Sequence, residues 1–189
     1  MPAGTIVLLG FVGSEGWPRF SASAEAADEQ PSPLDRWSRR IIDGLAAALG
    51  GSALYPFAGP PWLPFQRWAQ RTGDVFISPL GILIHPEYGL WHSYRGALAF
   101  AERLKLAPRT KPSSPCATCA AKPCLTACPV SAFSTVGYDV ARCRAHIASE
   151  AGAACMSGGC LARLACPVGA QHRYASDQAS FHMRAFRRG

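Results

Sequence analysis

The sequence lacks a long apolar run, a block of like charges and a low-complexity tract. No segment of its 189 residues reaches the roughly 20 apolar residues that cross a bilayer. The apolar start TIVLLGFVG has neither a basic segment before it nor a small-residue cleavage site after it, as an export signal would have. Because 49% of the residues are hydrophobic and only 16% are charged, extensive disorder is excluded. We therefore expect a globular, cytoplasmic protein with no membrane partner.

Familiar catalytic signatures are also missing. The sequence has no Ser-His-Asp order, no phosphate-binding loop, and neither a GxGxxG nor an HExxH motif. Asp74 and Glu87 are the carboxylates best placed in the sequence to act as a proton donor, but solvated surface charges explain them more simply. The sequence therefore leaves open whether the protein is an enzyme.

Cysteine is absent from the first 115 residues and concentrated in the remainder. All eight cysteines lie within 51 residues: Cys116, Cys119, Cys124, Cys128, Cys143, Cys155, Cys160 and Cys166. The segment APRTKPSSP, residues 107–115, is a predicted linker because its three prolines interrupt helices and strands. The predicted organisation is a mixed region over 1–106, this linker, a cysteine domain over 116–170 and a basic helix or tail over 171–189.

The cysteine spacing favours iron–sulfur chemistry. Residues 116–129 read C-x2-C-x4-C-x3-C-P, close to the bacterial ferredoxin run C-x2-C-x2-C-x3-C-P but with two added residues. The sequence CPVSA at 128–132 recurs as CPVGA at 166–170, which indicates a module with two similar centres. Structural zinc sites usually have paired C-x2-C knuckles, whereas this chain has one. Two [4Fe-4S] clusters are therefore favoured, with zinc, disulfides or free thiols as the alternatives.

One stretch of the cysteine domain resembles a known family. The sequence YDVARCRAHIASE (138–150), followed by Gly-Cys and Cys-Pro, is similar to the ferredoxin-type domain of epoxyqueuosine reductase (QueG) and of corrinoid-dependent reductive dehalogenases. The resemblance implies crossed ligation, with Cys116, Cys119, Cys124 and Cys166 on one cluster and Cys128, Cys143, Cys155 and Cys160 on the other.

Local signals within this domain predict a helix and a turn. Asp139 can cap a helix over 140–150, which places Cys143 and Ile147 on one face. Gly158 and Gly159 either bring backbone amides close to a cluster or form a simple turn.

The region before the linker predicts an α+β or α/β fold. Strands are expected over 5–13 and 53–57, and two extended segments over 75–86 around a Pro-Leu-Gly turn. A helix over 33–49 ends at two glycines, and a second helix is expected over 93–106. The first helix has apolar residues at helical spacing: Leu34, Trp37, Ile41, Leu45 and Ala48.

The sequence ILIHPEYGLWHSYRGAL (82–98) resembles a stretch of the cobalamin-processing CblC proteins. That resemblance implies a small nitroreductase-like α/β region ahead of the loop-rich, ferredoxin-like double-cluster domain. It also implies a corrinoid (cobalamin) contacted by His85, Tyr88, Trp91, His92, Tyr94 and Arg95. Aromatic residues would cover the flat face of this ligand and Arg95 would donate to its carbonyl groups. Ordinary core packing is the alternative, since both uses require the same residue types.

These observations favour an iron–sulfur electron-transfer protein that relays single electrons to a bound cofactor or to a redox partner protein. A complete corrinoid-dependent reductase is the first alternative, and a zinc-stabilised interaction module is the second. The net charge is +7, and the C-terminal HMRAFRRG is locally basic. This segment could contact an acidic redox donor or, through the epoxyqueuosine reductase resemblance, tRNA. A nucleic acid is the weaker expectation, because a solvated tail explains the same residues.

Overall fold

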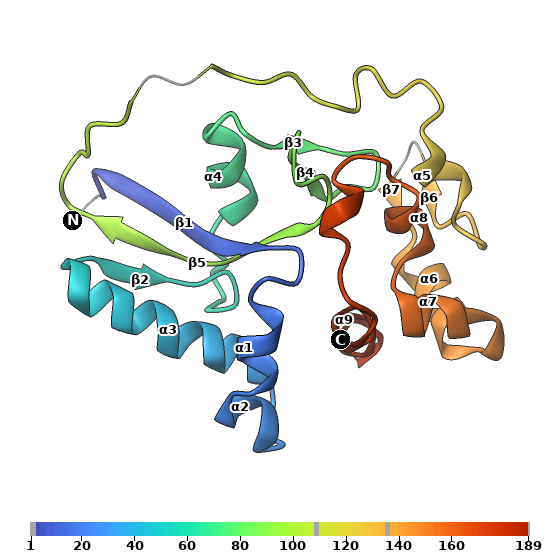
Figure 1. Ribbon diagram of the computed structural model, residues 1–189, viewed down its shortest axis with the longest axis horizontal. Coiled ribbons are helices and arrows are strands. Elements are labelled where there is room, and N and C mark those ends of the chain that lie inside the picture. Colours follow the sequence, from blue (N-terminus) through green and yellow to red (C-terminus); the bar gives the residue numbers. More distant parts are fainter. Residues whose placement is uncertain (1–2, 108–109, 135–136, 189) are drawn as a thin grey trace. The chain divides into compact units, whose positions relative to one another are not determined.

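The structure is a computed structural model that describes residues 3–107, 110–134 and 137–188. Its contacts divide the chain into two compact units (Figure 1). The N-terminal unit comprises Met1–Thr72 and Ser93–Lys111, and the cysteine unit comprises Gly73–His92 and Pro112–Gly189. Helices account for 41% of the described residues and strands for 16%, and the sheets are small and antiparallel, so the α+β class is confirmed. Residues 108 and 109 of the predicted linker lie outside the described residues.

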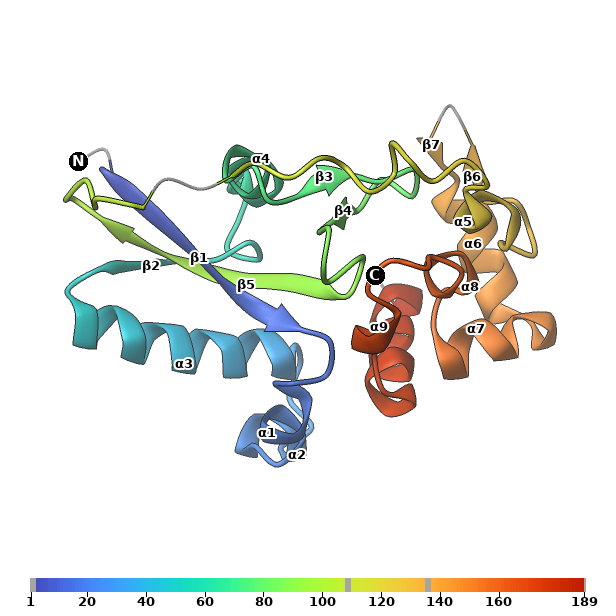
Figure 2. The ribbon, with the colours of Figure 1, turned by 45° about the horizontal axis from the view of Figure 1, so that its top comes forward.

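A three-stranded sheet forms the centre of the N-terminal unit. Its order is β1 (Thr5–Val12), β5 (His92–Phe100) and β2 (Ser52–Leu54). Helix α3 (Pro33–Leu49) runs along this sheet (Figures 1 and 2). Ile42 and Ala46 of α3 share a buried cluster with Tyr55 and Leu98, so the helix and the sheet enclose one core.

The predicted helix over 93–106 is wrong, because this segment forms strand β5 up to Phe100. Gly96, Ala97 and Leu98 are buried in succession, as is typical of a central strand. A Cβ atom on Gly96 would lie 2.5 Å from Ile42 Cδ1 and 3.0 Å from the Leu54 carbonyl oxygen. Pairing with two neighbouring strands and close packing by α3 therefore override the helical propensity of the alanines.

Helix α3 confirms the predicted helix, including its stop at Gly50, which has a φ of 68°. Its buried face differs from the predicted one. Trp37 is buried as expected, but Ile41 and Leu45 are each 40% exposed, and Ile42 and Ala46 are buried in their place. The helix has apolar residues on adjacent stripes, so periodicity alone does not decide which stripe faces the sheet.

Three short helices complete the N-terminal unit: α1 (Trp17–Ser21), α2 (Ala24–Ala27) and α4 (Phe65–Arg71). Two ion pairs attach the α2 region to α3, with Arg40 Nε 2.6 Å from Glu25 Oε1 and Arg36 Nη2 2.6 Å from Asp28 Oδ1. The sequence patterns predicted none of these helices, since each is too short to show a clear period.

The cysteine unit begins with a hairpin and continues as short helices and turns. Strands β3 (Phe76–Ile77) and β4 (Leu83–Ile84) pair antiparallel around Gly81, which has a φ of 75° and so confirms the two extended segments and their turn. The other elements are α5 (Pro123–Thr126), β6 (Phe133–Ser134), β7 (Gly137–Tyr138), α6 (Val140–Ala148), η1 (Glu150–Gly152), α7 (Ala153–Gly158), α8 (Leu161–Leu164), η2 (Ala170–His172) and α9 (Ser176–Arg188).

Residues 73–92 pack with the cysteine segment, although they precede the predicted linker. Leu80, Ile84 and Leu90 form a buried cluster with Cys124 and Cys166. The backbones also meet closely, because a Cβ atom on Gly89 would lie 1.9 Å from the Val168 carbonyl oxygen. The hairpin segment is thus part of the framework that positions the cysteines.

Within the described residues, no helix combines the length and the apolar character that a membrane span requires.

Candidate functional site

Four cysteines, which we call the first thiol group, line a narrow cavity of about 20 Å³: Cys116, Cys119, Cys124 and Cys166. Cys124 lies in α5, and Cys166 follows α8. The surrounding wall is mostly proline and aliphatic, formed by Pro79, Ile84, Pro115, Pro123, Pro167 and Val168. The hairpin segment, residues 115–124 and residues 166–168 therefore enclose these thiols from different parts of the sequence.

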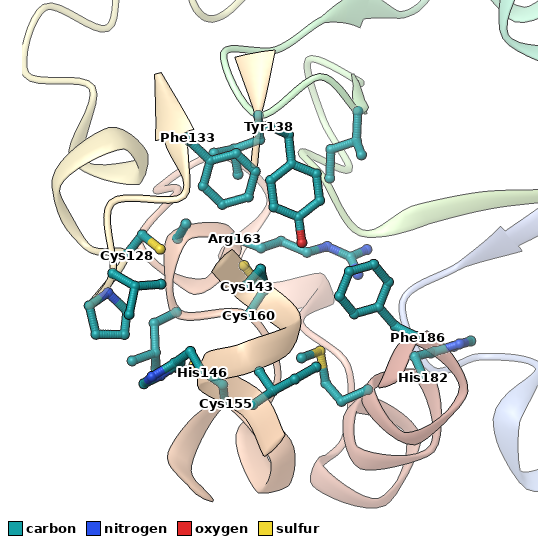
Figure 3. Close-up of a pocket in the computed structure, with 18 residues that line it drawn as sticks. Cys128, Phe133, Tyr138, Cys143, His146, Cys155, Cys160, Arg163, His182 and Phe186 are labelled. Carbon is teal, nitrogen blue, oxygen red and sulfur yellow. Dashed lines mark hydrogen bonds between the residues drawn. The ribbon is translucent and has the colours of Figure 1, made fainter. Parts of the chain in front are cut away.

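The other four cysteines, the second thiol group, line a cavity of about 310 Å³ (Figure 3): Cys128, Cys143, Cys155 and Cys160. The predicted cap of α6 is confirmed, because the Asp139 side chain accepts a hydrogen bond of 2.9 Å from the Arg142 amide. Cys143 and Ile147 both line the cavity, one helical turn apart, so a short capped helix presents this thiol to the cavity.

The electrostatics follow the same division into two groups. Burial raises the pKa of the Cys116 thiol, and the negative charge on Cys166, Cys124 and Cys119 raises it further. In the second thiol group, burial likewise raises the pKa of Cys155, with a further contribution from Cys143. All eight cysteines are free of disulfides. Four thiolates gathered in one desolvated place repel one another, so a cationic core would offset this cost.

The donor set fits an iron–sulfur cluster in both groups, since each offers four soft sulfur ligands. The structure brings together the same two sets of four that the epoxyqueuosine reductase resemblance implies. Considering only the described residues, no three His, Cys, Asp or Glu side chains form a site for a single metal ion.

Comparison with protein-family models, with curated proteins and with solved structures found no match to this chain.

A backbone amide and a histidine ring approach the sulfur atoms of the second thiol group. The Ala132 amide donates to Cys128 Sγ at 3.3 Å, and His146 Nε2 lies 3.8 Å from Cys155 Sγ. Burial and a hydrogen bond to Cys143 raise the pKa of the Tyr138 hydroxyl above its ordinary value. Sequence reasoning did not single out Tyr138 or His146, although both lie in the 138–150 stretch that carried the resemblance.

Aromatic rings close one side of the second cavity (Figure 3). Phe133 stacks on Tyr138 with ring centroids 4.5 Å apart, and Tyr138 stacks on Phe186 at 6.3 Å. The Arg144 guanidinium lies 5.2 Å from the centre of the Phe186 ring. Phe186 belongs to α9, so the C-terminal segment is a helix that contributes to the site, with Gly189 outside the described residues.

The two glycines after Cys155 end a helix. Gly159 has a φ of 95°, and its amide donates to the Cys155 carbonyl at 3.0 Å. A positive φ favours glycine, so the turn alone explains Gly159, as the simpler of the two interpretations of the sequence predicts.

The residues of the predicted corrinoid pocket are divided between the two units. Tyr94 and Arg95 lie in β5 within the N-terminal unit, whereas His85, Tyr88 and Trp91 belong to the cysteine unit. Arg95 forms an ion pair with Asp35, and its Nε donates to Ser38 Oγ at 3.1 Å. Its guanidinium is therefore already engaged within its own unit.

The cysteine-unit members of this set pack against protein side chains. His85 stacks on Tyr88 with centroids 4.3 Å apart, and Tyr88 meets His172 edge-on at 5.3 Å. Trp91 is 3% exposed and meets Tyr174 at 5.4 Å. Of the two candidate proton donors, Glu87 is exposed and Asp74 is half-buried. His85, Tyr88 and Trp91 thus contact other side chains of the cysteine unit, and a corrinoid at these residues stays a prediction.

His92, which is half-buried, gives a testable dependence of stability on pH. Burial lowers the pKa of His92 from 6.5 to about 4, against the opposing effect of its bond to the Gly89 carbonyl, and repulsion by His85 and Arg163 lowers it further. Between these values the unfolded chain binds a proton that the folded chain does not, so stability falls as the pH falls from about 7 to about 4. Allowing for partial solvent screening, we expect a loss of about 2 kcal/mol.

Urea unfolding of the wild-type protein and of His92→Gln across this pH range measures the effect. The variant should lose less stability than the wild type, because its side chain does not titrate. Parallel pH profiles for the two proteins would contradict the assignment to His92.

Proposed function

We propose that this protein is an electron-transfer protein with one [4Fe-4S] cluster on each thiol group, which passes single electrons to a redox partner protein. The observation that supports this most is the gathering of eight cysteines, spread over 51 residues, into two groups of four. Each group draws on distant parts of the sequence, as crossed ligation in a bacterial ferredoxin-like fold requires. The resemblance of residues 138–150 to epoxyqueuosine reductase and reductive dehalogenases agrees with this proposal.

The protein's own groups have defined parts in this function. The cysteine thiolates hold the clusters, which supply one-electron chemistry when bound. The Ala132 amide, His146 and Tyr138 stabilise negative charge on the sulfur atoms. Phe133, Tyr138 and Phe186 exclude water from one side of the second cavity, which strengthens these electrostatic interactions.

A reducing compartment such as the cytoplasm suits this proposal, because eight thiols must stay free of disulfides until the clusters assemble. The exposed arginines of α6 and α9, among them Arg142, Arg184 and Arg187, suit an acidic redox partner better than a neutral one. The corrinoid-dependent reductase, with a CblC-like N-terminal unit, is an alternative proposal that rests on the resemblance of residues 82–98.

Metal analysis tests the proposed function directly. Protein prepared without oxygen should contain about eight iron and eight sulfide per chain, because two cubane clusters require them. It should also show a broad visible absorption that bleaches on reduction. Stoichiometric zinc without sulfide would contradict the proposal and support the zinc-stabilised module. Titrating cobalamin into the same protein in a calorimeter separates the remaining alternatives, since stoichiometric binding heat would favour the corrinoid-dependent reductase.

A further inference from the structure

Arg163 holds a fixed position in the wall of the second cavity (Figure 3). It lies in α8, three residues after Cys160 and three before Cys166, yet it lines the cavity of the second thiol group. Arg163 therefore lies in the sequence between a cysteine of each group but lines the cavity of the second group only.

Several contacts hold the guanidinium in place. Its Nε and Nη2 donate to the Leu90 carbonyl oxygen at 3.1 Å and 2.5 Å. Its central carbon lies 4.4 Å from the ring centres of both Trp91 and Tyr174. Two aromatic rings and one carbonyl thus fix the cation, and the half-buried setting limits how far water screens it.

The positive charge of Arg163 has no ionic partner among the described residues. The ion pairs found in these residues involve Arg36, Arg40, Arg95 and Arg142. A carbonyl and two rings leave the full charge of Arg163 in place, so its field acts on whatever the cavity holds.

We propose that the charge of Arg163 raises the reduction potential of the cluster on the second thiol group above that of the cluster on the first. This inference rests on the proposed function. Reduction adds one negative charge to a cluster, and a fixed cation beside it stabilises the reduced form.

The cavity of the first thiol group has an apolar lining and only an exposed cation. Cys124 and Cys166 lie in an apolar cluster with Leu80, Ile84 and Leu90. Lys122 lines that cavity but is exposed, so water and salt screen its charge. No described residue that lines this cavity is a fixed cation. Its apolar lining therefore disfavours the added charge of reduction.

Hydrogen bonds to sulfur act in the same direction as Arg163. The Ala132 amide donates to Cys128, and the His146 ring donates to Cys155 in the tautomer that carries its proton on Nε2. Such donated bonds stabilise electron-rich sulfur. The second thiol group is therefore the one that is reduced first.

Potentiometric titration of the anaerobically prepared full chain, followed by electron paramagnetic resonance, tests the inference. Cys166→Ala protein assigns the signals, because it should retain only the second cluster. In the wild type, the second cluster should have the higher potential. Arg163→Gln should shift its one-electron equilibrium about tenfold towards the oxidised form, a fall of about 59 mV, with a smaller shift at the first cluster.

Two further variants separate charge from packing. Arg163→Lys keeps the charge and should retain more of the potential than Arg163→Gln, even though it loses the planar stacking. Arg173→Gln is the matched control, because Arg173 Nη2 also donates to a carbonyl, that of Leu164 at 2.7 Å, but lines neither cavity. It should leave both potentials unchanged.

The inference is overturned if both clusters are present and the second has the lower potential, or if Arg163→Gln and Arg173→Gln have equal effects. Where Arg163→Gln loses the second cluster altogether, the inference stands if the second cluster has the higher potential in the wild type and Arg163→Lys keeps that order, and it fails otherwise. Protein without iron and sulfide would instead contradict the proposed function itself, and the inference with it.

Discussion

Replacing Cys166 by alanine should reduce the iron content from about eight to about four per chain and remove one of the two cluster signals. Cys166 lines the same cavity as Cys116, Cys119 and Cys124, although it lies 42 residues or more beyond them in the sequence. Loss of one thiolate from a group of four leaves a cluster with an incomplete ligand set, so the first cluster should be lost and the second largely kept. Iron and sulfide analysis together with spectra of the reduced protein measure both effects.

Cys128→Ala is the informative companion to Cys166→Ala. Cys128 is only four residues from Cys124 but lines the second cavity. Ligation in sequence order would place Cys128 with Cys116, so this variant would then remove the same signal as Cys116→Ala. Crossed ligation predicts the opposite, that Cys116→Ala and Cys166→Ala share one phenotype and Cys128→Ala and Cys143→Ala share the other. A common phenotype for Cys116→Ala and Cys128→Ala would contradict the grouping.

Gly89→Ala should be strongly destabilising, with a loss of about 3 kcal/mol in the free energy of unfolding. Gly89 has a φ of 58°, and its added Cβ would lie 1.9 Å from the Val168 carbonyl oxygen. The contacting atom is backbone, so it cannot rotate away as a side chain would. Gly169 faces the same contact from the other side, because its Cβ would lie 2.4 Å from the carbonyl carbon of Tyr88.

The same substitution should weaken the first cluster more than the second. Val168 is two residues from Cys166, so moving this backbone displaces a ligand of the first thiol group. Gly81→Ala is the control, since Gly81 has a φ of 75° but no atom within 4 Å of the added Cβ. It should cost only the backbone strain of about 1 kcal/mol. Urea unfolding and iron analysis of both variants test this, and equal losses in the two would show that the close approach of the backbones has no effect.

Several features of the fold could be predicted from the sequence because their causes are local. The helix over 33–49 ends where a glycine takes a left-handed conformation, and α6 begins where Asp139 accepts a hydrogen bond from the Arg142 amide. The hairpin over 76–84 turns at a glycine with positive φ. Each signal involves residues within a few positions of one another, so the order of residues already contains it.

The strand β5 and the buried face of α3 were decided by the tertiary structure. Residues 93–100 contain alanines that favour a helix, but their place between two strands makes them a strand. Ile42 rather than Ile41 is buried, because the sheet contacts one of two apolar stripes. Neither choice has a cause within the segment concerned, since pairing and burial depend on distant partners.

The site shows the same division. The number of thiols and their sulfur chemistry follow from the sequence, and the resemblance implied how they divide into two groups. The residues around them do not follow from it: Tyr138, His146, Arg163 and Phe186 reach the second cavity from β7, α6, α8 and α9. The residue type alone decides whether a side chain offers a sulfur donor, so the sequence is enough to predict it. The field and the solvent exclusion around a ligand depend on which distant side chains the fold brings within a few ångströms, so only the tertiary structure decides them.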